Sequence, residues 1–319
     1  MRAFVAALAL ASLLAGCGGG GGGSDTSGRT DAAPVSPVVA QIEVHARPCG
    51  VNGGFGLVWT TSYSYDELIG IDPATNKPSG PPVKLGHQPC GVVAGAGSLW
   101  VEVFGANRVD RVDPAKREVL ERIPVGNQAW DIAFGAESVW CSNASDGTVS
   151  RIDPATNDVV STIETGGQPA NIRFGLGALW VGSNSGKAIY RIDPATEKVE
   201  KVPVGAEAPS SVALTDDAVW VMSRSDDLLV RLDASTHAVE ARIPVGRQPV
   251  VGATAPDGSV WVPNQGDSTV SRIDPATNKV TGTYKAGLGA VMVNEAFGDL
   301  WVTAFQGTTV TRVDPDRAG

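Results

Sequence analysis

A repeat of 40 or 41 residues runs through most of this 319-residue chain and constrains its fold more than any other feature. Each copy contains one aspartate at a fixed place: Asp72, Asp113, Asp153, Asp193, Asp233, Asp274 and Asp314. A tryptophan stands 13 residues before each of them: Trp59, Trp100, Trp140, Trp180, Trp220, Trp261 and Trp301. Self-similarity at such a period is the signature of a repeat architecture. The sequence therefore predicts seven copies of one structural unit in a single domain.

The copy around Trp180 shows what one unit contains. Short β-rich runs at 169–174, 178–182, 188–192 and 199–204 are separated by turn residues, and none has the period of a helix. Four consecutive runs of this kind predict an antiparallel four-stranded sheet. Seven such sheets, arranged radially, make an all-β, seven-bladed β-propeller, which we expect over residues 38–319.

The two ends of the repeat array complement each other. The last copy stops shortly after Asp314, before its fourth strand, while Val38–Val44 matches the fourth strand of another copy, Val159–Thr165. Pairing of Val38–Val44 with the strand around Val310–Val313 would close the ring and remove the edges that an open array exposes. We therefore expect the N-terminal strand to complete the last blade.

The repeated residues have structural explanations. In each Asp-Pro turn the aspartate accepts N–H groups just downstream and proline fixes φ, so turn chemistry accounts for the aspartates without a catalytic role. Each tryptophan supplies a ring of roughly 150–250 Å² for packing between sheets. An arginine two residues before the aspartate points to the same face of its strand. We expect these arginines to form ion pairs or to stack on aromatic rings: Arg111, Arg151, Arg191, Arg231, Arg272 and Arg312, with Gly70 in the first copy.

The net charge argues against one class of partner. The formal charge is −9 and is spread along the chain. Binding to phosphate backbones is favoured by a positive stripe, through counterion release. We therefore expect no nucleic-acid partner.

The residues before the repeats predict export. Residues 1–16 hold one positive charge, Arg2, and an apolar run too short to span a bilayer, as in a secretory signal. The run ends in Leu14-Ala15-Gly16-Cys17, which resembles a bacterial lipobox and implies that Cys17 receives lipid. The alternative is an ordinary export signal in which Cys17 is incidental. Residues 18–37, rich in Gly, Ser and Pro, are predicted to be a disordered tether. We expect a membrane-anchored lipoprotein on the periplasmic or outer face of the cell envelope.

The repeat also resembles a known family. The segments Leu-Trp-Val, Val-x-Arg-Ile-Asp-Pro-Ala-Thr and Ile-x-Val-Gly-x-x-Pro are similar to YVTN-type propeller repeats and to the virginiamycin B lyase (streptogramin lyase) superfamily, over Val38 to Pro315. The shared positions are turn and packing residues, so the resemblance implies the fold more than the function.

The resemblance to the lyases does not extend to their catalytic residues. Those members open a lactone ring by elimination, with a metal ion held by histidine and glutamate side chains from neighbouring blades. Here residues 243–319 contain no histidine, and the one acid near the rim in that range is Asp267. His237 falls in a turn on the opposite side from where propeller ligands usually bind. No catalytic residue is therefore carried over.

The variable loops are the place for a ligand site. In propellers the fourth-to-first and second-to-third strand loops share one face around the central channel, where ligands generally bind. The candidate rim residues are Trp130, Asp131, Asn143, Asn171, Asn184, Arg224, Asn264 and Phe305. This mixture suits a polar organic ligand or a segment of a partner protein. The alternative is a solvated rim without a ligand, because loops are polar by default.

Two cysteines occupy equivalent positions in consecutive Pro-Cys-Gly segments. Cys49 and Cys90 begin neighbouring first strands, which can bring their Cα atoms to the ~5–7 Å that a disulfide needs. An oxidising compartment favours that bond. Two free buried thiols, or a metal site with His45 and His87, are the alternatives. Cys141 stands where other copies have valine and is interpreted as a small buried apolar residue.

Three functions follow from these observations. The first is a monomeric binding or interaction module, without a cofactor and without an evident catalytic site. The second is a metal-dependent lyase or hydrolase related to the streptogramin lyases. The third is a redox accessory protein that uses Cys49 and Cys90. The sequence leaves the ligand or partner unnamed.

Overall fold

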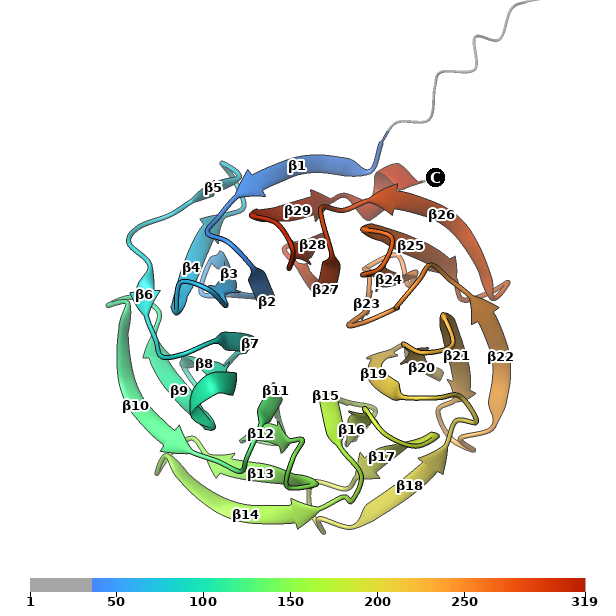
Figure 1. The fold of residues 1–319 in the computed structure, drawn as a ribbon, viewed down its shortest axis with the longest axis horizontal. Helices are drawn as coiled ribbons and strands as arrows, with labels where there is room; N and C mark the ends of the chain where they lie inside the picture. Colours follow the sequence, from blue (N-terminus) through green and yellow to red (C-terminus); the bar gives the residue numbers. More distant parts are fainter. Residues whose placement is uncertain (1–35, 319) are drawn as a thin grey trace, which may run out of the picture. The chain divides into compact units, whose positions relative to one another are not determined.

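The computed structural model describes residues 36–318. Within this range seven antiparallel β-sheets lie side by side around a ring, with the first strand of each sheet innermost (Figure 1). The predicted seven-bladed propeller is confirmed. No helix among the described residues is long and apolar enough to cross a membrane. The predicted signal segment, Cys17 and the tether up to residue 35 lie outside the described residues.

The blades are numbered 1 to 7 by their innermost strands, in chain order. These strands are β2 (Pro48–Gly54), β7 (Pro89–Gly95), β11 (Ala129–Gly135), β15 (Pro169–Gly175), β19 (Pro209–Leu214), β23 (Ala253–Thr254) and β27 (Ala290–Ala296). The second strands are β3 (Leu57–Ser62), β8 (Ser98–Val103), β12 (Ser138–Asn143), β16 (Ala178–Ser183), β20 (Ala218–Ser223), β24 (Val260–Asn264) and β28 (Asp299–Ala304). The third strands are β4 (Glu67–Asp72), β9 (Arg108–Asp113), β13 (Thr148–Asp153), β17 (Ala188–Ile192), β21 (Leu228–Asp233), β25 (Thr269–Asp274) and β29 (Thr309–Val313).

The outer strands complete the blades. In chain order they are β1 (Val38–Glu43), β10 (Glu118–Pro124), β14 (Asp158–Glu164), β18 (Val199–Pro203), β22 (Val239–Pro244) and β26 (Lys279–Lys285), with β5 (Lys77–Pro78) and β6 (Val83–Lys84) as two short pieces in blade 1. Two 3₁₀ turns, η1 (Phe104–Ala106) and η2 (Pro315–Ala318), lie outside the sheets. Gly80, Pro81 and Pro82 separate β5 from β6, because proline has no N–H for the strand ladder.

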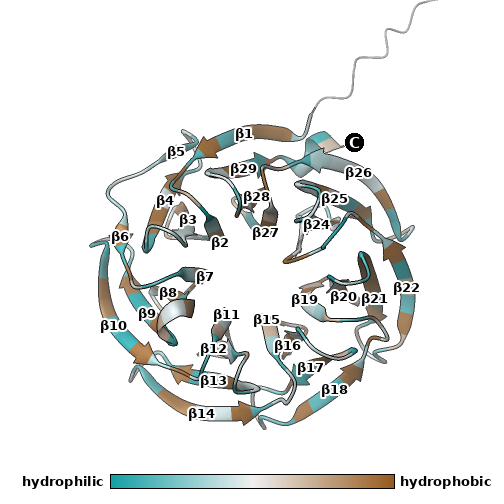
Figure 2. Ribbon diagram, in the orientation of Figure 1, coloured by the Kyte–Doolittle hydropathy of each residue, from teal (hydrophilic) through white to brown (hydrophobic). Residues whose placement is uncertain are grey.

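Burial follows the position of a strand within its blade. Every residue of β12, β16 and β20 is buried, because a second strand has a neighbour on each side in its own sheet and a blade above each face. The outer strands face solvent on one side. Figure 2 shows apolar and polar bands alternating along outer strands such as β10 and β22, as expected for half-buried strands.

The seven repeated tryptophans form the centres of the blade interfaces. Each is at most 1% exposed. The expected stacking of arginines is confirmed in five blades, where the guanidinium lies 4.9–5.9 Å from the ring centroid: Arg111 on Trp100, Arg151 on Trp140, Arg191 on Trp180, Arg231 on Trp220 and Arg312 on Trp301.

Blade 1 reaches the same packing by another route. Its Gly70 has no side chain to cover Trp59, and Arg117 from the turn before β10 lies over that ring instead, at 5.0 Å. Arg117 Nη1 also donates to the carbonyl of Pro81, at 3.1 Å. The interrupted outer strand of blade 1 is thereby covered by the next blade.

The Asp-Pro turns have the predicted chemistry. Asp193 Oδ1 accepts the backbone N–H groups of Ala195 and Thr196, both at 2.9 Å. These bonds, with that from Thr196 the largest contribution, hold the pKa of Asp193 below its usual value. The aspartates of the other turns accept the same kind of bond, as Asp153 does from Ala155 at 2.8 Å. The repeated aspartates therefore belong to the turns.

The predicted ring closure is confirmed. β1 pairs with β29, and the register places Ile42 opposite Val310. Beyond the strand, Val44 N donates to the carbonyl of Thr308 at 2.7 Å. Ile42 is 3% exposed and belongs to the cluster that joins blades 7 and 1. Residues from both ends of the repeat array thus form one sheet.

Candidate functional site

A cavity of about 280 Å³, termed the upper cavity, occupies one mouth of the central channel. Residues at or near the starts of the innermost strands line it: Cys49, Cys90, Trp130, Asp131, Asn171, Ser210, Val250, Val251, Val291 and Met292. The second-to-third strand loops add Tyr63, Phe104, Asn184, Arg224, Gln265 and Phe305. The cavity is therefore on the face where the sequence placed a ligand site.

Most of the candidate rim residues meet in this cavity. The candidate residues that line it come from four blades: Trp130, Asp131, Asn171, Asn184, Arg224 and Phe305.

The placement of Asn143 and Asn264 at the rim was wrong. Both are fully buried at the ends of β12 and β24. Each amide donates to two hydroxyls of its own blade, at 2.9–3.0 Å, on Thr148 and Ser150 or on Thr269 and Ser271. Glycines of the incoming loops, Gly126 and Gly246, pack against these amides. Each asparagine therefore links the second and third strands of its blade and does not line the upper cavity.

One side of the upper cavity is an aromatic arc, formed by Phe305, Tyr63, Phe104 and Trp130. These rings come from blades 7, 1, 2 and 3, with successive centroids 5.4, 6.4 and 6.0 Å apart. The Arg47 guanidinium lies over two of them, 4.3 Å from the Phe305 centroid and 4.9 Å from that of Tyr63. The arc already holds one cation and presents apolar faces to the cavity.

The other side of the upper cavity is polar. Asn184, Arg224 and Gln265 come from blades 4, 5 and 6, across the channel from the aromatic arc. Arg224 Nη2 donates to Gln265 Oε1 at 2.6 Å, which fixes both side chains over the mouth. The cavity therefore has an apolar half and a hydrogen-bonding half.

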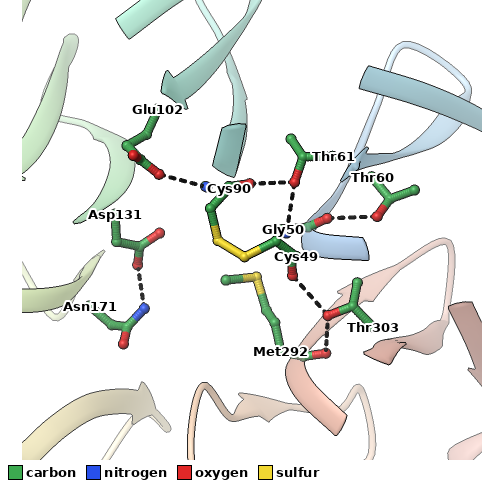
Figure 3. Close-up of a disulfide and its surroundings, with 11 residues drawn as sticks. Cys49, Gly50, Thr60, Thr61, Cys90, Glu102, Asp131, Asn171, Met292 and Thr303 are labelled. Atoms are coloured by element: carbon green, nitrogen blue, oxygen red, sulfur yellow. Dashed lines mark hydrogen bonds between the residues drawn. A yellow bond between two sulfur atoms is a disulfide. The ribbon is translucent and has the colours of Figure 1, made fainter. Parts of the chain in front are cut away.

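Asp131 forms the floor of the cavity at the centre of the channel. It is 2% exposed, and its Oδ2 accepts from Asn171 Nδ2 (3.1 Å), Ile172 N (3.1 Å) and Arg173 Nη1 (3.2 Å). Figure 3 shows its other oxygen directed towards the channel centre. A second cavity of about 160 Å³ lies below and shares Asp131 and Met292 with the upper one. The two residues thus lie where the two cavities adjoin.

Cys49 and Cys90 are joined by a disulfide, with Cα atoms 4.9 Å apart (Figure 3). The bond ties β2 to β7 beside the cavity floor. The metal-site alternative with His45 and His87 does not fit this geometry. His45 Nδ1 contacts the buried Glu67, and the largely exposed His87 lies beside Asp66.

Glu102 is a buried acid that the sequence analysis did not select. It stands on β8, two residues after Trp100, where other blades have Thr61, Ser142 and Thr303. Those hydroxyls donate to carbonyls of the next blade. Burial raises the pKa of Glu102 well above its ordinary value. The hydrogen bond from Gly91 N lowers this pKa, and the charge of Asp131 raises it. The available sequence signal was the charge, because the other copies have a hydroxyl or an uncharged residue at this position, as with Gly182, Met222 and Pro263.

The buried Glu102 makes stability depend on pH. Because its pKa is raised on folding, the folded chain retains a proton that the unfolded chain loses near the ordinary pKa, about 4.3. We expect the free energy of unfolding to fall as the pH rises above about 5, by up to about 1.4 kcal/mol per pH unit for this one group, until Glu102 ionises in the folded chain as well. Glu102→Gln should remove that part of the slope in urea unfolding.

The matched control for this variant is Glu137→Gln, at an exposed glutamate. It should keep the slope of the unmodified protein. Equal slopes in all three proteins would show that Glu102 ionises alike in the folded and unfolded chain.

The sequence comparison agrees with the fold. Residues 81–318 match the virginiamycin B lyase family. The chain belongs to this family. No curated protein matches the sequence.

Solved structures extend the comparison of the fold. Virginiamycin B lyase from Staphylococcus aureus is 16% identical, with a TM-score of 0.76, and the match covers 86% of this chain and 98% of that one. A catalytically inactive variant of that enzyme with quinupristin is 16% identical, with a TM-score of 0.75 and the same coverage. The WD40 propeller domain of Doa1 is 14% identical, with a TM-score of 0.75, covering 88% and 98%. At these identities the likeness concerns the propeller fold.

The histidine and glutamate set of the virginiamycin B lyases does not fit this member of the family. The chain has three histidines, and His237 lies on the face opposite the upper cavity, 5.3 Å from the Trp180 ring and 3.1 Å from Glu200. Within residues 36–318, no three side chains of His, Cys, Asp or Glu are grouped to hold a metal ion. The side chains around the upper cavity therefore do not match the donor set that such a metal would need.

Proposed function

We propose that this protein is a binding module whose upper cavity takes an organic ligand with an apolar face and a hydrogen-bonding edge. The ligand is a small molecule or a short segment of a partner protein. The observation that supports this is the division of the cavity, with the aromatic arc on one side and Asn184, Arg224 and Gln265 on the other. Pockets that combine apolar walls with a few placed polar groups are typical ligand sites.

Trp130 offers a direct readout of ligand binding. It is the one tryptophan of eight outside the repeated blade positions, and it lines the cavity. We expect its fluorescence to change when members of a panel of aromatic amides, lactones and short aromatic peptides bind. In Trp130→Phe the remaining fluorescence comes from the seven buried tryptophans, and this signal is subtracted from that of the unmodified protein.

A double variant tests where these compounds bind. In Phe104→Ala/Arg224→Ala the affinity should fall by about tenfold or more, roughly 1.4 kcal/mol. Tyr65→Ala is the matched control, because Tyr65 is an exposed aromatic residue outside the cavity lining. If every compound that binds the unmodified protein binds the double variant equally well, the upper cavity is not the site.

The cellular location is part of the proposal. A lipidated Cys17 would hold a monomeric propeller at the membrane of the cell envelope, with residues 18–37 as the tether. In cells that express the full chain, Cys17→Ala should move the protein from the membrane fraction to the soluble fraction. An unchanged distribution contradicts the lipid anchor.

A lyase or hydrolase activity is the second candidate, and family membership favours it. Quinupristin, present in the solved structure of the inactive relative, is the natural substrate to try. Liquid chromatography with tandem mass spectrometry, run with and without added divalent metal, distinguishes the cyclic compound from its linear products. Elimination gives an isomer of the same mass with another retention time and fragmentation, and hydrolysis adds one water. Absence of product under both conditions would contradict a lyase or hydrolase activity on this substrate.

A redox accessory role is the third candidate, favoured by the disulfide at the cavity wall. Thiol titration of the denatured protein shows whether Cys49 and Cys90 are oxidised as isolated. If both cysteines react as free thiols, the isolated protein has no disulfide with which to oxidise a partner, and the redox role is contradicted.

A further inference from the structure

Three sulfur atoms meet at the floor of the upper cavity. The Cys49–Cys90 disulfide joins β2 and β7, and Met292 comes from β27 on the other side of β2. All three residues line the cavity, and Figure 3 shows the Met292 thioether beside the disulfide. We propose that reduction of this disulfide creates a site for the soft monovalent ion Cu(I), bound by the two thiolates and the thioether. The site goes beyond the proposed organic ligand and does not depend on it.

The two cysteines are held together by more than their covalent bond. Thr61 Oγ1 donates to the carbonyl of Cys90 at 2.7 Å and accepts Gly50 N at 2.9 Å. A Cβ at position 50 would collide with that carbonyl, so glycine permits the close approach of β2 and β7. None of these contacts involves a sulfur atom, so we expect them to hold both thiols at the same point of the channel after reduction.

Met292 is fixed to the same position by a second hydroxyl. Thr303 Oγ1 donates to the carbonyl of Cys49 at 2.8 Å and lies 3.4 Å from that of Met292. Met292 itself is 6% exposed. The three ligand side chains therefore project from neighbouring backbone segments that are tied to one another, and little ordering remains to be done when a metal binds.

The donor set selects the metal. Thiolates and thioethers are soft ligands, which favour Cu(I), whereas a structural Zn(II) site has four ligands, typically cysteine thiolates and histidine imidazoles. The histidines nearest in sequence are engaged elsewhere, His45 with Glu67 and His87 beside Asp66. The floor carboxylate of Asp131 accepts three hydrogen bonds through Oδ2, and its oxygens are hard donors that Cu(I) does not favour. Three sulfur donors from three blades match the soft ion.

The redox step balances with a dithiol as the reductant. The dithiol supplies two electrons and two protons, the bond between Cys49 and Cys90 breaks, and the reductant becomes a disulfide. Cu(I) then replaces the two thiol protons, which pass to water, and the copper keeps its oxidation state. The mouth of the upper cavity gives both reductant and metal access to the sulfur atoms.

The test uses the full chain with Cys17→Ser, so that this thiol does not contribute. The protein is reduced with a phosphine, freed of it without air, and titrated with Cu(I) in competition with bicinchoninate. We expect one Cu(I) per reduced chain, no competition by the oxidised chain, and a loss of binding in Cys49→Ser/Cys90→Ser. Met292→Leu should weaken binding by roughly tenfold or more.

Matched controls come from buried sulfur elsewhere. Met222→Leu and Cys141→Ala alter a fully buried thioether and a fully buried thiol away from the site, and both should bind Cu(I) as the parent does. If Met292→Leu binds like the parent, or if reduced protein fails to compete, the proposal is overturned. Zn(II) binding as tight as Cu(I) binding would overturn the choice of metal. Met292→Leu keeps both cysteines and its fold is checked by circular dichroism, so the test stands even if the double serine variant fails to fold.

Discussion

A chain that begins at Val44, and so lacks β1, is expected to lose about 5 kcal/mol or more of its free energy of unfolding. The deletion removes the buried side chain of Ile42 and every pairing of β29 with β1. It also leaves β29 as an exposed edge, which is prone to pair with another molecule. Urea unfolding should show a lower midpoint, and size-exclusion chromatography should show self-association.

The matched control for this deletion is a chain that begins at Ser36 and keeps β1. It should unfold like the full chain and stay monomeric. If the two truncated chains have the same midpoint, closure by the N-terminal strand contributes nothing to stability.

Asp131→Ala is expected to destabilise the protein by roughly 3–5 kcal/mol, the range for breaking a buried ion pair. The substitution leaves the Arg173 guanidinium without its anion and removes the acceptor of Ile172 N. One Arg173 nitrogen, Nη2, is buried and has no hydrogen-bond partner among the described residues, so nothing nearby replaces the carboxylate. Urea unfolding measures the loss.

Two further variants separate charge from shape. Asp131→Ala/Arg173→Met removes both charges and should recover part of the loss, because no unpaired ion remains in the channel. Asp267→Ala removes an aspartate that is 32% exposed and pairs with the exposed Arg247, and it should cost much less stability than Asp131→Ala. A double variant as unstable as Asp131→Ala alone would show that the ion pair is not the cause.

The asymmetry of the upper cavity bears on function. The blades share one repeat, yet the aromatic arc lies on blades 7, 1, 2 and 3 and the polar groups on blades 4, 5 and 6. A ring built only for stability has no need of this division, because the channel-facing loops contribute little to the blade cores. The difference between the two halves is therefore the feature that would orient a bound ligand.

The architecture could be predicted from the sequence alone, because its elements depend on local chemistry that recurs in every copy. The Asp-Pro turns set the third-to-fourth connection, and the tryptophans mark the second strands. The missing fourth strand after Asp314 and the matching segment Val38–Val44 predicted the closure. The pairing of Cys49 with Cys90 was also within reach, because their equivalent positions in consecutive copies place them on neighbouring strands.

Most of the side chains that meet in the channel could be expected from the sequence, but their final directions depend on contacts between blades. The innermost strands have register shifts near their starts, as between Ala129 and Asp131, and a shift of one residue moves a side chain to the other face. Adjacent residues such as Trp130 and Asp131 can therefore both line the cavity. The side chain of Asn143 points into its own blade and not into the channel, because it donates to hydroxyls of that blade. Its position in the repeat did not indicate this direction. The repeat determines the strands, whereas contacts between blades determine the site.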